Sequence, residues 1–270
     1  MTAQELIKAG QLGEARQMLT EQIKSAPANL EVRNLLFQVL SFLGEWDKAE
    51  RHLEVLALQA PPVPAAAFLH YRNLVRAEKA RLEVERGAGL PEFLTKPPGY
   101  LGEFLQARAA LAAGSGESFL ALAGALEKRL PQLEGVANGV PFAGFSDCNP
   151  GTFWVLESFV HDRYLWFPFS SIRELTVQKP AQLLDLLWNS ATVVTWEGVT
   201  TDCYLPVLYA GTPGHGDDQV RLGRLTDWLP AGGGCQRGVG QHLLQVGDQE
   251  KGLLELGTVS FSFPAPEGKP

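Results

Sequence analysis

A 34-residue internal repeat near the N-terminus is the feature that most constrains the fold of this chain. The segment 9–27, AGQLGEARQMLTEQIKSAP, aligns without gaps with the segment 43–61, LGEWDKAERHLEVLALQAP. The two segments agree at Gly10 and Gly44, Ala15 and Ala49, Leu19 and Leu53, Ala26 and Ala60, and Pro27 and Pro61. Self-similarity at this period is typical of stacked helix pairs, so we expect a helical repeat array.

Each shared position has a mechanical role in a tetratricopeptide-like helix pair. The glycine ends the first helix, where a left-handed residue is favoured. The alanine permits close helix contact, and the proline stops the second helix. A third helix is expected over 64–87, but Glu78 and Glu83 stand where glycine and alanine would recur. We therefore expect a longer capping helix, with Arg81 and Glu85 forming an i,i+4 pair on its exposed side.

The concave face of such an array is the expected binding surface. It is lined by the leading helix of each repeat, which suits a peptide or a partner helix. The polar residues expected there are Gln4, Glu31, Asn34, Gln38, Ser41 and Arg72. An ordinary solvated helix face explains the same polar stripe, and the sequence alone leaves both interpretations open.

The second half of the chain has a different character. After one more helical pair over roughly 100–130, glycine becomes frequent and apolar residues begin to alternate with polar ones. Strands are predicted over 152–160, 163–169, 191–199, 200–209 and 219–229 and in two further segments near the C-terminus. His161-Asp162 is expected to form a tight turn, and Pro180 to open a short helix over 179–190.

These patterns predict an α+β protein with two domains. A tetratricopeptide-like, all-helical domain is expected over residues 1–134, followed by a β-rich α+β domain over 135–263 with a mixed or antiparallel sheet. Residues 264–270, PAPEGKP, are expected to form a disordered C-terminal tail.

Charge and cysteine usage exclude several functional classes. The 270 residues carry a net charge of −7, which argues against a general nucleic-acid binder. The chain contains no apolar run of about 18 residues, so no membrane span is predicted. The N-terminal segment lacks the pattern of a secretion signal. Cys148, Cys203 and Cys235 lack metal-ligand spacing and indicate free thiols in a reducing compartment, so we expect a cytoplasmic protein.

The segment 209–228, YAGTPGHGDDQVRLGRLTDW, is the part that most suggests chemistry. Its glycines are not followed by the lysine and hydroxyl of a phosphate loop. His215, Asp217 and Asp218 offer metal ligands, which His161-Asp162 or His242 could join, but no histidine pair has ligand spacing. We predict no catalytic residue, no metal and no cofactor. The alternative is a metal- or ligand-binding enzyme domain in the second half, docked by the helical repeats.

The other polar residues of this segment are expected to stabilise the C-terminal fold. Arg221 and Arg224 would face opposite sides of a strand, so they would not form one clamp. Arg224 is expected to pair with Asp227 or with Asp185. Trp228, like most tryptophans of the second half, is expected to pack in the core.

Several motifs occur together in an order that resembles a known family. They are FLGEWDKAERHLEVLA (42–57), LWFPF (165–169), LLDLLW (183–188), LPVLY (205–209) and RLGRLTDW (221–228). Together they resemble the ImpE/TagJ family, also called SciE-type virulence proteins, which are accessory components of bacterial type VI secretion systems. The resemblance covers nearly the whole chain.

The resemblance implies a non-enzymatic, cytoplasmic adaptor. Members bind the small subunit of the contractile sheath, TssB or VipA, through its N-terminal helix, and have been linked indirectly to sheath handling by the ClpV unfoldase. No role with nucleic acid or membrane is implied. This chain departs from the family in an acidic cluster: Asp147 is kept, whereas Cys148 and Asn149 replace further acids or their spacer. The role of that cluster is left open.

Overall fold

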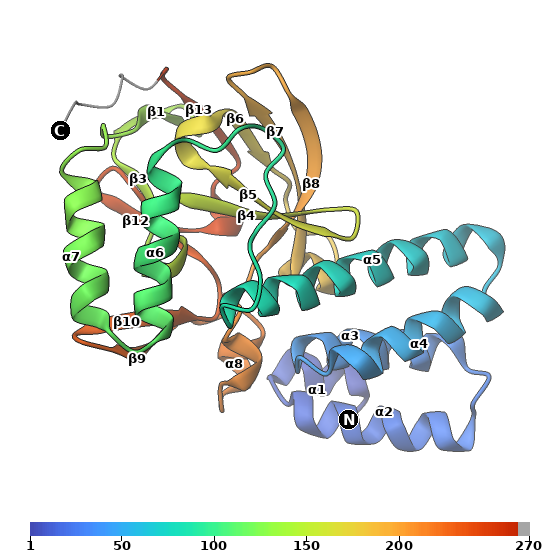
Figure 1. Ribbon diagram of the computed structural model, residues 1–270. Helices are drawn as coiled ribbons and strands as arrows, with labels where there is room; N and C mark the ends of the chain where they lie inside the picture. The colour runs from blue at the N-terminus through green and yellow to red at the C-terminus, as the bar shows by residue number, and fades with distance from the viewer. Residues whose placement is uncertain (264–270) are drawn as a thin grey trace.

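The computed structural model describes residues 1–263 and places a helical array and a β-rich part on either side of one long helix (Figure 1). The helices are α1 (Ala3–Ala9), α2 (Leu12–Ser25), α3 (Leu30–Phe42), α4 (Trp46–Gln59), α5 (Pro62–Glu85), α6 (Tyr100–Ala112), α7 (Gly116–Glu127) and α8 (Asp218–Arg221). The strands are β1 (Glu134–Ala137), β2 (Val140–Ala143), β3 (Phe145–Asp147), β4 (Val155–Val160), β5 (Arg163–Pro168), β6 (Ile172–Val177), β7 (Trp188–Thr195), β8 (Thr200–Pro206), β9 (Asp227–Gly232), β10 (Cys235–Val239), β11 (Leu243–Val246), β12 (Gln249–Gly252) and β13 (Thr258–Phe261). The predicted α+β fold is confirmed.

The first four helices form the two predicted repeats. Gly10, with φ of 76°, follows α1, and Gly44, with φ of 69°, follows α3, so both repeat glycines adopt the left-handed conformation. The repeat alanines, Ala15 and Ala49, are fully buried. Small side chains at these positions let neighbouring helices approach closely, as the repeat pattern predicts.

Helix α5 joins the array to the sheet. It spans Pro62–Glu85, close to the predicted 64–87, and contacts α4 as well as β4 and β5. Aromatic rings continue the core across this junction, because Trp188 of β7 packs against Trp46 of α4 and Tyr71 of α5 at centroid distances of 6.1 and 6.5 Å. The hydrophobic core is therefore continuous between the two parts.

The main sheet has eight strands in the order β2-β1-β13-β6-β7-β8-β4-β5, and all neighbouring pairs are antiparallel. A three-stranded sheet, β12-β11-β3, and the hairpin β9–β10 complete the β-rich part. The predicted turn at His161-Asp162 joins β4 to β5, with His161 at φ of 57°. Helices α6 and α7 pack on each other on the far side of α5 from the repeats, and α7 contacts the β9–β10 hairpin (Figure 1).

Two local predictions are wrong. The segment 179–190 forms only a 3-10 turn at Leu183–Leu186, because the chain from Trp188 onward pairs with β8 as a strand. The segment 219–229 begins with the short helix α8, because the Asp217 carboxylate accepts the N–H of Gln219 and caps it. The strand there starts only at Asp227.

Two further expectations concern the limits of the domains. The first strand begins at Glu134, while the division at 134/135 stays a prediction. The expected tail, 264–270, lies outside the described residues. Within residues 1–263, no helix is both long and apolar enough to cross a bilayer.

Candidate partner-binding site

A groove of about 1030 Å³ lies between α1, α2 and α3. Its base is apolar and its rim is polar, so it presents both surfaces that an amphipathic helix requires. The base is built from Ile7, Met18, Leu19, Val32, Leu35 and Leu183. The rim carries Gln4, Lys8, Gln22, Glu31, Asn34 and Gln38.

The structure brings together four of the six residues predicted on the concave face, namely Gln4, Glu31, Asn34 and Gln38. Ser41 was expected there wrongly: it is 0 % exposed, and its hydroxyl donates to the carbonyl of Phe37 one turn earlier. Ser41 lies two turns beyond Asn34 on the same face of α3, but the prediction failed because the C-terminal end of this helix is buried on all sides, from Val39 to Phe42. Arg72 is half-buried on α5 and does not line this groove.

One residue of the groove comes from the β-rich part. Leu183 belongs to the 3-10 turn before β7, and Leu184 beside it is 3 % exposed and anchored in the core. Asp185 organises this turn, because one carboxylate oxygen accepts the N–H groups of Ala181 and Gln182 at 2.7 and 3.0 Å. Sequence reasoning placed Leu183 in a motif without assigning it a contact.

Residues 211–224, which we call the latch segment, dock onto equivalent turns of both repeats. A methyl group on Gly44 would lie 2.6 Å from Cβ of Pro213, and one on Gly10 would lie 2.0 Å from the side-chain nitrogen of Gln219. Both repeat glycines are favoured by their left-handed backbone, and Gly44 also permits the close approach of the rigid Pro213 ring, whereas the flexible Gln219 side chain can shift away from a methyl group at position 10. The C-terminal ends of α1 and α3 both face the β-rich part.

Two charged residues of the latch segment bind helix ends. The Asp218 carboxylate accepts the N–H of Leu12, at the start of α2, at 2.7 Å. The Arg224 guanidinium donates to the carbonyls of Lys8 and Ile7, at the end of α1, at 3.0 and 3.2 Å. An anion at a helix N-terminus and a cation at a helix C-terminus both complement the helix dipole, so these contacts stabilise the junction.

The predicted partners of Arg224 are therefore wrong, and Arg221 lies in the helix α8 instead of the predicted strand. Arg224 pairs with neither Asp227 nor Asp185, because it reaches across to the helical array. Arg221 forms an ion pair with Asp218 at 2.8 Å within α8. Trp228 is half-buried, with its ring 6.1 Å from that of Tyr209. Sequence reasoning missed the contacts of Arg224 and Asp218 with the helical array because they join residues more than 200 positions apart.

The residues considered as metal ligands have other partners. Asp217 caps α8, Asp218 binds α2, and the His215 ring lies 3.3 Å from Asp227. His161 lies in the β4–β5 turn. Among residues 1–263, no group of three or more His, Cys, Asp or Glu side chains is arranged to hold a metal ion.

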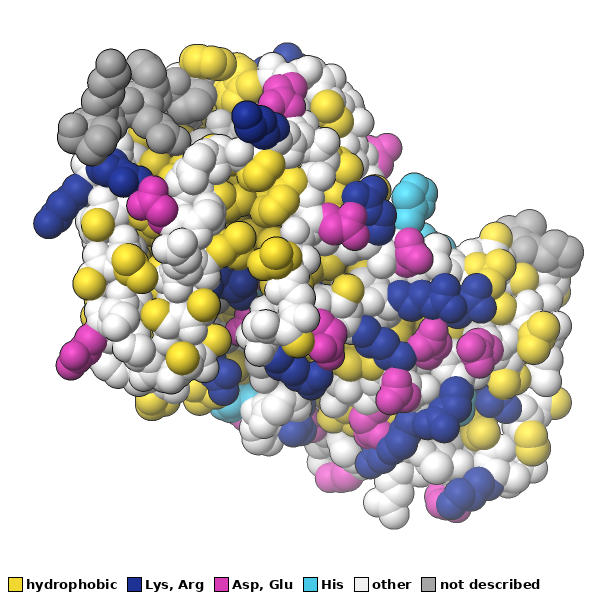
Figure 2. Space-filling view, viewed as in Figure 1, with side chains coloured by type: hydrophobic (Ala, Val, Ile, Leu, Met, Phe, Trp, Pro, Cys, Tyr) yellow, Lys and Arg dark blue, Asp and Glu magenta, His cyan; other side chains and the backbone are white. Residues whose placement is uncertain are grey.

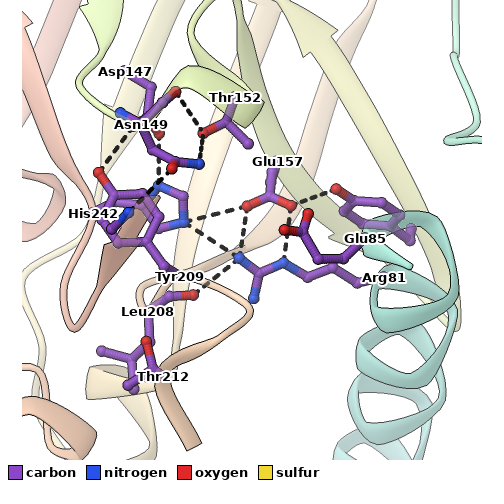
Figure 3. A network of polar contacts seen from close by, with 12 residues as sticks. Arg81, Glu85, Asp147, Asn149, Thr152, Glu157, Leu208, Tyr209, Thr212 and His242 are labelled. Atoms are coloured by element: carbon purple, nitrogen blue, oxygen red, sulfur yellow. Dashed lines mark hydrogen bonds and ion pairs between the residues drawn. The ribbon is translucent and has the colours of Figure 1, made fainter. Parts of the chain in front are cut away.

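A buried ionic network lies where α5 meets the sheet (Figure 3). Arg81, 2 % exposed, donates to both carboxylate oxygens of Glu157 at 2.9 and 2.6 Å and to Glu78 at 2.9 Å. The predicted exposed pair of Arg81 with Glu85 is wrong, because this side of α5 packs on β4. Glu85 accepts a hydrogen bond from Arg108 instead.

His242 extends the network toward β3. Its Nδ1 lies 2.6 Å from Asp147 and its Nε2 lies 3.2 Å from Glu157, while the Tyr209 hydroxyl donates to Asp147 at 2.9 Å. Burial alone would raise the pKa of Glu157, but the charge of Arg81 and the hydrogen bonds from His242 and Arg81 hold that pKa well below its ordinary value. Burial alone would lower the pKa of His242, but Asp147 and Glu157 raise it.

The altered acidic cluster is part of this network. Asp147 is 3 % exposed, and it also accepts the N–H of Asn149 at 2.7 Å. The Asn149 side chain donates to Thr152 at 3.1 Å and accepts the N–H of Gly238 in β10 at 3.1 Å. Asp147 and Asn149 therefore hold neighbouring segments together, which an acidic pattern in the sequence does not reveal.

The network has no room for a substrate. The cavity beside Asp147, Glu157 and His242 measures about 10 Å³, which has room for about one water molecule and none for a substrate. The nearest thiol is not activated either, since burial and the charge of Asp147 raise the pKa of Cys148 to about 12. The arrangement fits a structural junction.

The fold defines a two-part α+β protein, in which a tetratricopeptide-like array is joined to a β-rich part by the latch segment and a buried ionic network. Sequence profiles agree: a tetratricopeptide repeat matches residues 6–70, and the ImpE protein matches residues 139–260. Over 262 residues the chain is 37 % identical to the type VI secretion system accessory component TagJ of Pseudomonas aeruginosa, covering 97 % of this chain and 91 % of that protein.

The chain belongs to the ImpE/TagJ family, as its motifs predicted. A solved structure, protein VPA1032 from Vibrio parahaemolyticus, has the same fold, with a TM-score of 0.87 over 96 % of this chain and 97 % of that chain. At 20 % sequence identity this likeness concerns the fold alone.

Proposed function

We propose that this chain is a non-enzymatic adaptor of a bacterial type VI secretion system. It acts in the cytoplasm and holds the N-terminal helix of the sheath small subunit, TssB or VipA, in the groove between α1, α2 and α3. The observation that carries the proposal is this groove, with its apolar base and polar rim on a tetratricopeptide array, in a chain whose relative is named an accessory component.

The chemistry of the groove favours an amphipathic helix. Its base buries Ile7 and Leu19, and Val32 and Leu35 are half-buried, so apolar surface is available to a partner. Among the described residues that line it, Lys8 and Glu31 carry charged side chains, one of each sign, and Met1 adds its terminal amino group. A strongly charged segment would gain little there. A helix with an apolar stripe and neutral flanks would bury that stripe on the base and form hydrogen bonds with the polar side chains of the rim.

The other faces of the array give less support for a charged partner. Figure 2 shows Lys and Arg side chains interspersed with Asp and Glu over α4 and α5. Many of them pair with each other, for example Lys79 with Asp47 at 2.7 Å and with Glu50 at 2.6 Å. Alternating charge of this kind produces no single-sign field for nucleic acid. Any effect of this chain on the ClpV unfoldase would be indirect, through its binding of the sheath subunit's N-terminal helix.

Titration calorimetry with a synthetic peptide of the sheath subunit's N-terminal helix tests the proposal. Asn34→Arg and Gln38→Arg should each weaken binding by at least about 1 kcal/mol, roughly fivefold in Kd, because each places a charge and a longer chain inside the contact. Gln17→Arg is the matched control: Gln17 is exposed on α2 and outside the groove lining, so binding should not change.

Two outcomes would reject the proposal. Unchanged affinity in both groove variants would move the binding site out of the groove. Binding of the full sheath subunit that survives deletion of its N-terminal helix would remove the proposed occupant.

A further inference from the structure

We propose that the β-rich part supplies one end of the groove and contacts the bound helix through Leu183, so that the occupant is read by both domains at once. The inference rests on the proposed function, since it concerns the same groove. It adds a recognition element that the repeats do not contain.

The position of Leu183 carries the inference. All other lining residues of the groove come from the segment between Met1 and Gln38, whereas Leu183 reaches it from the turn before β7. Its neighbour Leu184 is buried in the core, but Leu183 is only half-buried and turns toward the groove. A leucine left partly exposed at the edge of an apolar groove offers surface that a partner can cover.

The turn that carries Leu183 is held in place before any partner arrives. The Asp185 carboxylate accepts two backbone N–H groups of the turn, and the Gln182 side chain donates to the Tyr71 hydroxyl on α5 at 2.9 Å. These bonds tie the turn to itself and to the helical side of the junction. A contact residue that is already ordered loses little entropy on binding, so Leu183 can contribute most of its buried surface to affinity.

The latch segment fixes which end of the groove Leu183 closes. The C-terminal ends of α1 and α3 abut Gln219 and Pro213, so the β-rich part lies at that end. Glu31, at the first turn of α3, lies at the opposite, open end. Between Glu31 and Gln38 the helix rises about 10 Å, about two turns. A bound helix that follows α3 over this length therefore ends beside the β-rich part, with an apolar residue facing Leu183.

The test compares full-length variants in the same calorimetric titration. Leu183→Asp should weaken binding of the peptide at least about tenfold, because it buries a charge at the contact. Leu183→Met, which keeps the volume and the apolar character, should bind within about twofold of wild type. Leu90→Asp is the matched control, because Leu90 is 74 % exposed and lies outside the groove lining. Thermal melting confirms that each variant is folded.

The outcomes separate this inference from the proposed function. Weaker binding by Leu183→Asp alone, with Leu183→Met and Leu90→Asp near wild type, supports the contact. Unchanged binding by Leu183→Asp, together with weaker binding by Gln38→Arg, overturns the role of the β-rich part and leaves the groove as the site. Unchanged binding in both variants overturns the inference and the proposed function together.

Discussion

Replacing Arg81 by methionine should reveal how strongly the buried network holds α5 on the sheet. Methionine keeps an apolar stem of similar length but removes the guanidinium that faces Glu157 and Glu78, which are 7 % and 4 % exposed. Removing one partner of a buried ion pair costs about 3–5 kcal/mol, because the remaining charge is left without compensation. Here two carboxylates lose their cation, so we expect the upper part of that range.

The free energy of unfolding from urea titration measures this cost. Arg86→Met is the matched control, because Arg86 pairs with Glu83 on the same helix while their side chains are 68 % and 56 % exposed. That variant should change stability by no more than about 0.5 kcal/mol. Both substitutions remove one guanidinium group from an ion pair, so the difference between their unfolding free energies reports the effect of burial.

A second variant separates lost attraction from stranded charge. When Arg81→Met is combined with Glu78→Gln and Glu157→Gln, part of the lost stability should return, because neutral amides replace the uncompensated carboxylates. If the free energy of unfolding of Arg81→Met lies within about 1 kcal/mol of the wild-type value, the network does not hold α5 on the sheet and the prediction is wrong.

Three other perturbations test the junction at separate points. His242→Gln should lower the free energy of unfolding most below about pH 6.5, because the protonated ring binds its two carboxylates. The difference in unfolding free energy between wild type and variant should shrink as pH rises through the raised pKa of folded His242. A difference that stays the same at every pH would contradict this prediction. Gly44→Ala should destabilise by at least about 1–2 kcal/mol, because of left-handed strain and because the added methyl group would lie 2.6 Å from Cβ of Pro213. Gly13→Ala, in open space in the first turn of α2, should stabilise by up to about 0.5 kcal/mol. Equal shifts of the two melting temperatures in the same direction would count against this prediction. Arg224→Ala should speed amide hydrogen exchange in α1 but not in β13, and uniform exchange would show that it does not act locally.

Local sequence rules succeeded where a residue's role depends on its own backbone. Gly10 and Gly44 were predicted to be left-handed from the repeat alone, and both are. The same rules failed for Arg81, because an i,i+4 pattern on a helix does not show which face meets a sheet formed by residues 76 positions later. They failed similarly for Ser41, where the end of α3 turns into the core. Helix periodicity gives the direction of a side chain and not the element packed against it.

The two most distinctive features of the sequence, the 34-residue repeat and the latch segment, contact each other in the structure. The repeat places Gly10 and Gly44 one period apart, at the ends of α1 and α3, and the latch segment places Gln219 and Pro213 against them. Neither feature reveals this alone, since a glycine in a turn and a glycine-rich loop each have a sufficient local explanation. The contact explains why a segment that suggests phosphate or metal chemistry contains Asp218 and Arg224: their charges match helix ends. A change in the latch segment should therefore displace the repeats relative to Leu183, and alter the groove without touching its lining.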